Sequence, residues 1–141
     1  MTDIALVVRR VIRATPARVF EAWTTPSELL RWWGPRSVRC TAAEIDLRVG
    51  GSYRIANELP DGRVLWIVGE FEEIVIPHRL VYTWRIQESA PCERVTVRFE
   101  PRDGRTEVIV VHERIVDART RQEHQTGWRE CLDGLERMFT W

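Results

Sequence analysis

The chain has 141 residues, of which 44% are hydrophobic and 30% are charged, so we expect one folded domain with its own core. Its 21 basic and 21 acidic residues cancel, which argues against a protein whose main partner is nucleic acid. Every basic residue is Arg, and the absence of Lys excludes chemistry that uses a lysine amine as nucleophile.

The cysteines and the N-terminal segment indicate the cellular compartment in which the protein is expected. Cys40, Cys92 and Cys131 are scattered and form no CxxC pair, so the sequence predicts neither a disulfide framework nor a zinc site. The apolar run near the N-terminus is too short for a membrane span and lacks the layout of a signal peptide. We therefore expect a cytoplasmic protein with no membrane span.

The first elements are a strand and two short helices. Ile4 to Arg13 is rich in Val, Ile and Leu, which is typical of a strand. Thr15-Pro16 predicts the start of a first helix, with Thr as N-cap and Pro at the first helical position. Thr25-Pro26 predicts a second start, where Glu28 completes a capping box. Gly34-Pro35 ends this second helix.

Strand and turn signals continue from residue 37 to residue 115. Polar and apolar residues alternate in this region, so that Leu80, Tyr82, Trp84 and Ile86 share one apolar face. Short turns rich in Gly, Pro and Asp separate the strand-like runs. Six strands joined by short turns predict an antiparallel meander, with a bulge at Gly69. The predicted strands are Val38–Leu47, Ser52–Asn57, Val64–Ile76, Arg79–Gln87, Glu93–Glu100 and Thr106–Ile115.

The C-terminal segment changes to a helical period. Thr120 with Glu123 matches a capping box, and large apolar residues recur at helical spacing from Trp128 onward, which predicts a helix from Thr120 to Trp141. A helix of this length extends about 30 Å, enough to cross a curved sheet. The expected fold class is α+β, and a pocket between sheet and helix is its natural consequence.

Four local strings resemble a known family. They are VFEAWTTPSELLRWWGP, DLRVGGSYRI, GEFEEIVIPHRLVYTW and HQTGWRECLDGLERM. The chain resembles, over essentially its whole length, the activator-of-heat-shock-chaperone-ATPase homology (AHSA-like) family of the START-like (SRPBCC) superfamily. The resemblance implies the helix-grip fold, in which a curved antiparallel sheet of about seven strands wraps around a long C-terminal helix. The superfamily includes lipid carriers, plant allergens, polyketide cyclases and antibiotic-sequestering proteins.

The predicted binding wall is largely aromatic. Trp84 lies on the apolar face of its strand and Trp128 on the apolar stripe of the long helix, so both are expected between sheet and helix. Core packing alone explains these residues equally well. The candidate ligand-binding residues are Trp32, Trp33, Tyr53, Trp66, Tyr82, Trp84, Val97, His112, Trp128, Leu132 and Leu135.

The adjacent pair Trp32 and Trp33 cannot both face the core, because helix faces repeat at three and four residues. We expect one of them to pack inward against the long helix. The other is expected to line the pocket entrance or to remain partly exposed, either as part of a lid or as a cap on the rim of the domain.

Few polar groups are candidates for chemistry. His112 shares a face with apolar residues and His124 precedes Trp128 by one helical turn, so the two form either a polar anchor with a general base or simply satisfied histidines. Two histidines alone do not predict a metal site, and no cofactor is expected. Glu70 faces inward only if Gly69 is a bulge, and Asn57 is expected to place a polar group in an apolar pocket.

The favoured function is binding of a small hydrophobic or aromatic molecule. Two alternatives stay open: a cyclase- or hydrolase-like enzyme that uses His112 or Glu70 as base, and a co-chaperone-like protein-interaction module. Ile109 and Val111 are expected on the outer face of the sheet, which indicates either a homodimer interface or contacts within the domain.

Overall fold

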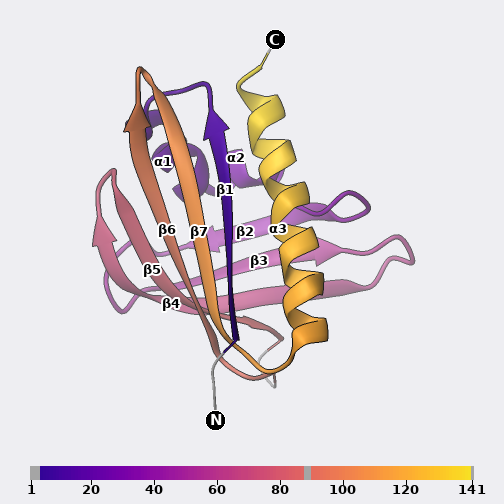
Figure 1. Ribbon diagram of the computed structural model, residues 1–141. Coiled ribbons are helices and arrows are strands. Elements are labelled where there is room, and N and C mark those ends of the chain that lie inside the picture. The colour runs from indigo at the N-terminus through magenta and orange to yellow at the C-terminus, as the bar shows by residue number, and fades with distance from the viewer. Residues whose placement is uncertain (1–3, 88–89, 141) are drawn as a thin grey trace.

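The computed structural model describes residues 4–87 and 90–140, and within them the chain forms seven strands and three helices in the predicted order (Figure 1). The strands are β1 (Ile4–Ile12), β2 (Arg39–Ile45), β3 (Ser52–Glu58), β4 (Val64–Val75), β5 (Arg79–Ile86), β6 (Glu93–Arg102) and β7 (Arg105–Ile115). The helices are α1 (Pro16–Thr24), α2 (Pro26–Trp32) and α3 (Ala118–Met138). None of these helices is long and apolar enough to cross a membrane.

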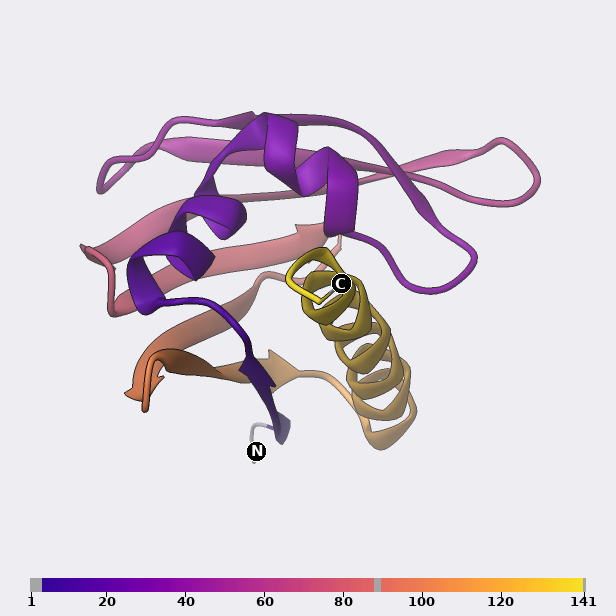
Figure 2. The ribbon, with the colours of Figure 1, turned by 90° about the horizontal axis from the view of Figure 1, so that it is seen from above.

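The strands form one antiparallel sheet in the order β1-β7-β6-β5-β4-β3-β2. Strands β2 to β7 are a meander, and β1 pairs with β7 at the far edge. The sheet bends so strongly that β1 lies on one side of α3 and β2 and β3 lie on the other (Figure 2). The α+β helix-grip arrangement expected from the sequence is therefore confirmed.

The long helix begins earlier than the sequence predicts. It starts at Ala118, and the Oδ1 atom of Asp117 accepts a hydrogen bond from the backbone N–H of Thr120 over 2.7 Å. The capping box predicted at Thr120 is thus wrong, because Asp117 supplies the cap three residues earlier. The helix ends at Met138, and Trp141, the predicted end, lies outside the described residues.

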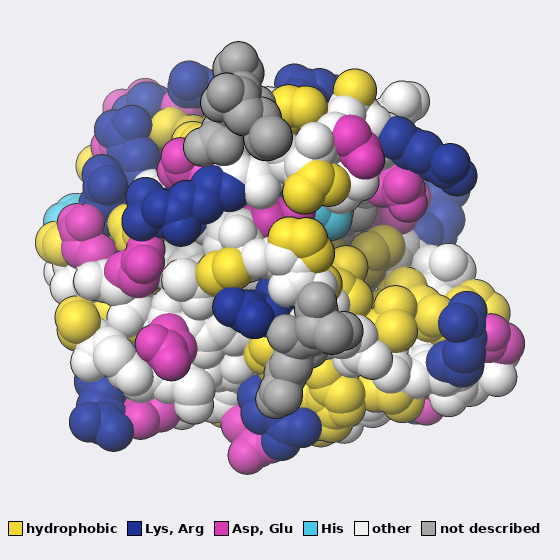
Figure 3. Space-filling model, turned by 90° about the horizontal axis from the view of Figure 1, so that it is seen from below, with side chains coloured by type: hydrophobic (Ala, Val, Ile, Leu, Met, Phe, Trp, Pro, Cys, Tyr) yellow, Lys and Arg dark blue, Asp and Glu magenta, His cyan; other side chains and the backbone are white. Residues whose placement is uncertain are grey.

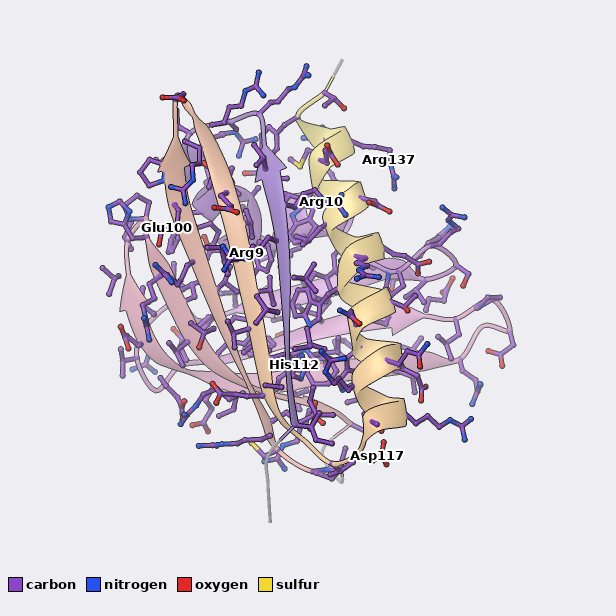
Figure 4. The ribbon with its side chains drawn as sticks, viewed as in Figure 1. Arg9, Arg10, Glu100, His112, Asp117 and Arg137 are labelled. Atoms are coloured by element: carbon purple, nitrogen blue, oxygen red, sulfur yellow. The ribbon has the colours of Figure 1, made fainter. Side chains whose placement is uncertain are left out.

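An ion-paired arginine joins the edge strand to the helix. The Nη1 atom of Arg10 on β1 lies 2.7 Å from Oδ1 of Asp133 and 2.9 Å from Oε1 of Glu136 on α3. Figure 4 shows Arg10 beside the helix. Because one cation serves two partly buried carboxylates, this network holds α3 against β1 more firmly than an isolated surface pair would.

The two short helices pack against each other and against α3. Thr25 is the N-cap of α2, but its side chain makes no capping hydrogen bond, so the predicted capping box is wrong here too. Gly34, which follows the Trp pair, has a φ of +128°, a conformation that favours glycine. A Cβ atom at Gly34 would lie 2.6 Å from the carbonyl oxygen of Val38.

The outer face of the sheet carries scattered apolar residues. Ile109 is buried, with Arg9 and Arg98 as its register partners on the neighbouring strands, and Val111 is half-buried. The aliphatic parts of arginine side chains can cover such a residue within one domain. The homodimer stays a prediction.

Two glycines on α3 differ in what surrounds them, which gives a stability prediction. A Cβ atom at Gly134 would lie 2.3 Å from the carbonyl oxygen of Trp32, whereas one at Gly127 would meet only Pro35 Cγ at 3.8 Å. Gly127→Ala is expected to stabilise the protein by about 0.5–1 kcal/mol through helix propensity. Gly134→Ala is expected to destabilise it by about 1–3 kcal/mol, because α2 must move away.

Urea unfolding of both variants and the wild type measures the two free energies. A stabilising Gly134→Ala substitution would contradict the close approach of α2 to α3.

Candidate functional site

A cavity of about 380 Å³ lies between the N-terminal half of α3 and the strands β3 to β5. The helix contributes Thr120, Glu123, His124, Gly127, Trp128 and Cys131 to its wall. The strands contribute Asn57, Leu65, Ile67, Trp84 and Ile86, and the connecting segments contribute Trp33, Pro35, Val38 and Leu59. Seen from below, hydrophobic side chains gather in a hollowed part of the surface (Figure 3).

Three tryptophans give the cavity its aromatic wall. Trp33 packs edge to face on Trp128, with ring centroids 5.5 Å apart, and its Nε1–H donates to Oδ1 of Asn57 over 3.0 Å. The Asn57 amide in turn donates to the carbonyl oxygens of Ile55 and Leu65. The Asn57 side chain therefore ties the Trp33 wall to β3, and it places a polar group in the cavity wall as expected.

Trp84 is the wall residue with an unused polar group. The residue is buried, yet its indole Nε1–H has no hydrogen-bond partner among the residues that the structure describes. Its ring meets those of His112 and His124 edge to face, with centroids 4.7 Å and 4.8 Å away. The Nε1 atom is shielded from solvent and from the cavity, so this donor is an unsatisfied group within the protein.

A carboxylate joins the two histidines at one end of the cavity. The Oε1 atom of Glu93 lies 2.7 Å from Nε2 of His112 and 2.9 Å from Nε2 of His124. On its other side, the His112 ring accepts at Nδ1 a hydrogen bond from Nε1–H of Trp128 over 2.9 Å. Figure 4 shows His112 between the sheet and α3. We call Glu93, His112, His124 and Trp128 the polar network.

The directions of the hydrogen bonds in the polar network follow from the Trp128 donor and from the charge of Glu93. An indole N–H can only donate, so Nδ1 of His112 carries the lone pair and Nε2 carries the proton. Burial lowers the pKa of His112, partly offset by its hydrogen bond to Glu93, so the ring stays neutral. Burial alone would raise the pKa of Glu93, but the hydrogen bonds from His112 and His124 outweigh it and lower the pKa to about 2. Glu93 is therefore a carboxylate that accepts from both rings.

The same donor types also occur in metal sites. Three atoms that could bind a metal, one each from Glu93, His112 and His124, lie within 4.8 Å of one another. However, a metal on Nε2 of His112 would require the proton to move to Nδ1, where it would face the Trp128 N–H. The hydrogen bond from Trp128 thus favours a proton-bonded network over a metal site at these residues.

The predicted wall residues divide into several groups. Trp33, Trp84 and Trp128 line the cavity, and His112 lies directly behind two of them. Tyr53 and Tyr82 line a separate void of about 20 Å³, which holds at most a water molecule.

Other predicted wall residues belong to the core or to the outer face. Val97, Leu132 and Leu135 are fully buried and lie outside the cavity lining. Trp66 lies on the opposite face of β4, where the Arg54 guanidinium stands 4.1 Å from its ring centroid. Alternation along β4 explains this position, because its neighbours Leu65 and Ile67 line the cavity.

The side chains of Trp32 and Trp33, at the end of α2, point in different directions. Trp32 is buried among aromatic rings, 5.0 Å from Trp23 between ring centroids, and its Nε1–H donates to the carbonyl oxygen of Ala22 over 2.9 Å. Trp33 faces the cavity and is also buried. Of the two alternatives for the second tryptophan, a partly exposed side chain is therefore wrong, and Trp33 instead lines the cavity.

One candidate base and one thiol in the cavity wall are unsuited to catalysis because of their surroundings. Pairing of β3 with β4 is regular through Gly69, and the irregularity in β4 lies between Phe71 and Glu73, so Glu70 points outward and is exposed. The bulge predicted at Gly69 is wrong, and with it the possibility that Glu70 is a base in the cavity. Burial raises the pKa of the Cys131 thiol to about 12, so this cavity residue stays protonated at neutral pH.

Glu93 is the functional candidate that sequence reasoning missed. The alternation that directs Val95, Val97 and Phe99 inward also directs Glu93 inward, two residues earlier on the same strand. This alternation along β6 was the feature of the sequence that could have identified Glu93 as an inward-facing residue. The partner His124 was considered only as a companion of His112, and the carboxylate between them was not expected.

This architecture, a curved antiparallel sheet around a C-terminal helix with a cavity between them, defines a helix-grip protein. Residues 13–140 match the family described as activator of Hsp90 ATPase homolog 1-like proteins, and the chain belongs to that family. Proteins with this fold commonly bind hydrophobic ligands. No curated protein sequence matches the chain significantly.

Solved structures agree with this assignment. A protein from Chromobacterium violaceum is 26% identical with a TM-score of 0.85, and the alignment covers 96% of each chain. A protein from Rhodobacter sphaeroides is 26% identical with a TM-score of 0.82, covering 95% of this chain and 90% of that one. The AHSA1 protein from Silicibacter pomeroyi is 23% identical with a TM-score of 0.82 over 96% of each chain, a likeness of fold.

The charge of Glu93 predicts a pH-dependent contribution to stability. Its pKa falls from 4.5 to about 2 on folding, so its stabilising effect is complete above pH 4.5 and is lost as the pH falls towards 2. Glu93→Gln is expected to cost about 1–3 kcal/mol at pH 7, because two buried N–H donors lose a charged acceptor. The difference from wild type should narrow at pH 3.

Urea midpoints at pH 7 and pH 3 measure this effect, with Glu70→Gln, an exposed carboxylate on β4, as matched control. A Glu93→Gln difference that is the same at both pH values would show that the carboxylate is not held ionised by the histidines.

Proposed function

We propose that this protein binds a small hydrophobic or aromatic molecule in the cavity between α3 and strands β3 to β5. The observation that carries the proposal is the 380 Å³ cavity with Trp33, Trp84 and Trp128 in its wall. Its volume falls in the range of about 300–1,000 Å³ typical of small-molecule sites. Apolar walls with few, converging polar groups are also typical of such sites.

Cavity formation here has a structural cause. The space between sheet and helix is filled at the α1–α2 end by aromatic side chains, with Trp23 contacting both Phe99 and Trp32. Towards the start of α3 the helix presents Gly127, which has no side chain to fill the space. An apolar void of this size costs stability, so its presence in a folded domain favours a ligand-binding role over plain core packing.

The surface gives less support to the protein-interaction alternative. Large exposed hydrophobic side chains come from β1, α2, both ends of β4 and the β2–β3, β4–β5 and β7–α3 connections. They include Val7, Leu30, Val49, Val64, Ile76 and Val116. An interaction module would present such residues as one contiguous patch. Their spread over several elements favours the cavity as the binding feature.

Native mass spectrometry of the purified protein, compared with the denatured chain, tests the proposal directly. We expect a bound small molecule whose mass is lost on denaturation. A protein that carries no such molecule and that binds neither naphthalene-type probes nor other apolar aromatics would contradict the proposed function.

Two substitutions test the cavity itself. Trp84→Ala removes a wall residue and is expected to abolish binding of an aromatic probe. Gly127→Leu places a side chain between α3 and Pro35, both of which line the cavity, and is expected to weaken binding at least tenfold by occupying the space. Gly127→Ala is the matched control and should leave affinity within about threefold.

Probe affinity is measured by calorimetric titration, and circular dichroism establishes that each variant is folded. Unchanged affinity in folded Trp84→Ala and Gly127→Leu proteins would place the ligand elsewhere.

A further inference from the structure

The polar end of the cavity has one ring nitrogen that the protein itself does not use. His124 lines the cavity, and its Nε2 atom is held by Glu93 at 2.9 Å. Its Nδ1 atom has no hydrogen-bond partner in residues 4–87 and 90–140. The residue is only partly buried, so this nitrogen can be reached from the cavity or its mouth.

The partner of Nε2 decides what Nδ1 can do. An ionised carboxylate only accepts hydrogen bonds, so Nε2 of His124 must carry a proton that it donates to Glu93. In the neutral imidazole, Nδ1 is then a lone pair and accepts a hydrogen bond. His112 cannot take this role, because Trp128 already occupies its Nδ1 atom.

The charges around His124 favour a neutral ligand group over an anion. Glu93 faces the ring from β6, Glu123 lines the cavity beside it on α3, and the neutral His112 ring stacks on it from β7 with centroids 4.7 Å apart. From β5, Trp84 faces the ring with its uncharged indole. A carboxylate or phosphate group placed here would meet these two carboxylates, and no arginine is among the residues that line the described cavity, which is unfavourable for an anion in a partly desolvated site.

A hydroxyl group is a neutral donor of the kind that this nitrogen can accept from. It can donate its proton to Nδ1 of His124 and still accept a hydrogen bond on its oxygen. The Trp84 ring lies beside this site, with its centroid 4.8 Å from that of His124. The aromatic wall next to these groups suits a flat ring that carries the hydroxyl.

We propose that the ligand of this cavity is a phenol-type molecule, whose hydroxyl group donates a hydrogen bond to Nδ1 of His124. This inference rests on the proposed function, because it assigns a chemical class to the molecule in that cavity. Glu93 is a positioning residue here, since it holds His124 in the orientation and tautomer that leave Nδ1 free.

A matched pair of probes tests the inference. 2-Naphthol and 2-methylnaphthalene have nearly the same shape, and only the first has a hydroxyl group. We expect wild-type protein to bind 2-naphthol about tenfold more tightly, as measured by titration monitored by nitrogen–proton correlation spectra. His124→Phe keeps a ring at this position and should bind the two probes within about threefold of each other. His78→Phe, which changes a histidine in the β4–β5 connection, is the matched control and should retain the preference.

A second measurement needs no variant. Long-range nitrogen–proton correlation spectra resolve the two ring nitrogens of His124. The Nδ1 resonance should shift when 2-naphthol binds and should not shift in the same way with 2-methylnaphthalene, because only the hydroxyl group donates to it.

The possible outcomes separate the two levels of the argument. Equal affinity of wild type for both probes would overturn the phenol assignment and leave the proposed function standing. A preference that persists in His124→Phe, or an unchanged Nδ1 resonance, would overturn the role of His124. Failure of both probes to bind would overturn the proposed function and this inference together.

Discussion

The hydrogen bond from the Trp128 indole to Nδ1 of His112 determines the chemistry of the whole polar network. It joins α3 to β7 and fixes the proton of His112 on Nε2. That proton is donated to Glu93, which together with the bond from His124 keeps the carboxylate ionised although it is buried. Only then is His124 held with its remaining nitrogen free. The Trp128 donor, which cannot act as an acceptor, thus sets the tautomer of His112, and the ionised Glu93 sets that of His124.

Packing at the other end of the domain determines where the cavity lies. The second short helix turns Trp32 into the aromatic core and Trp33 onto Trp128. Gly134 lets the backbone of Trp32 approach α3 closely, so α2 lies directly against this end of the helix. The cavity is therefore confined to the first half of α3, where Gly127 and the polar network lie.

The sequence predicted the order of elements, the antiparallel sheet and the inward faces of β5 and β7, because alternation and helical spacing report directly on burial. It did not predict which part of the sheet–helix space stays open. Leu132 and Leu135 have the same helical spacing as Trp128, yet only Trp128 reaches the cavity, since the difference depends on how α2 packs. Glu93 was within reach of the same alternation that places Val95 inward, whereas the tautomer of His112 depends on a contact between distant elements.

The free Nδ1 atom of His124 gives the proposed binding site its one polar contact. A ligand that cannot donate to this nitrogen would displace water from it without replacing the hydrogen bond, so the proposed site discriminates against plain hydrocarbons. In the proposed complex the apolar wall supplies most of the binding free energy, and His124 selects the orientation of the ligand. Affinity and selectivity are thus carried by different groups of the same cavity.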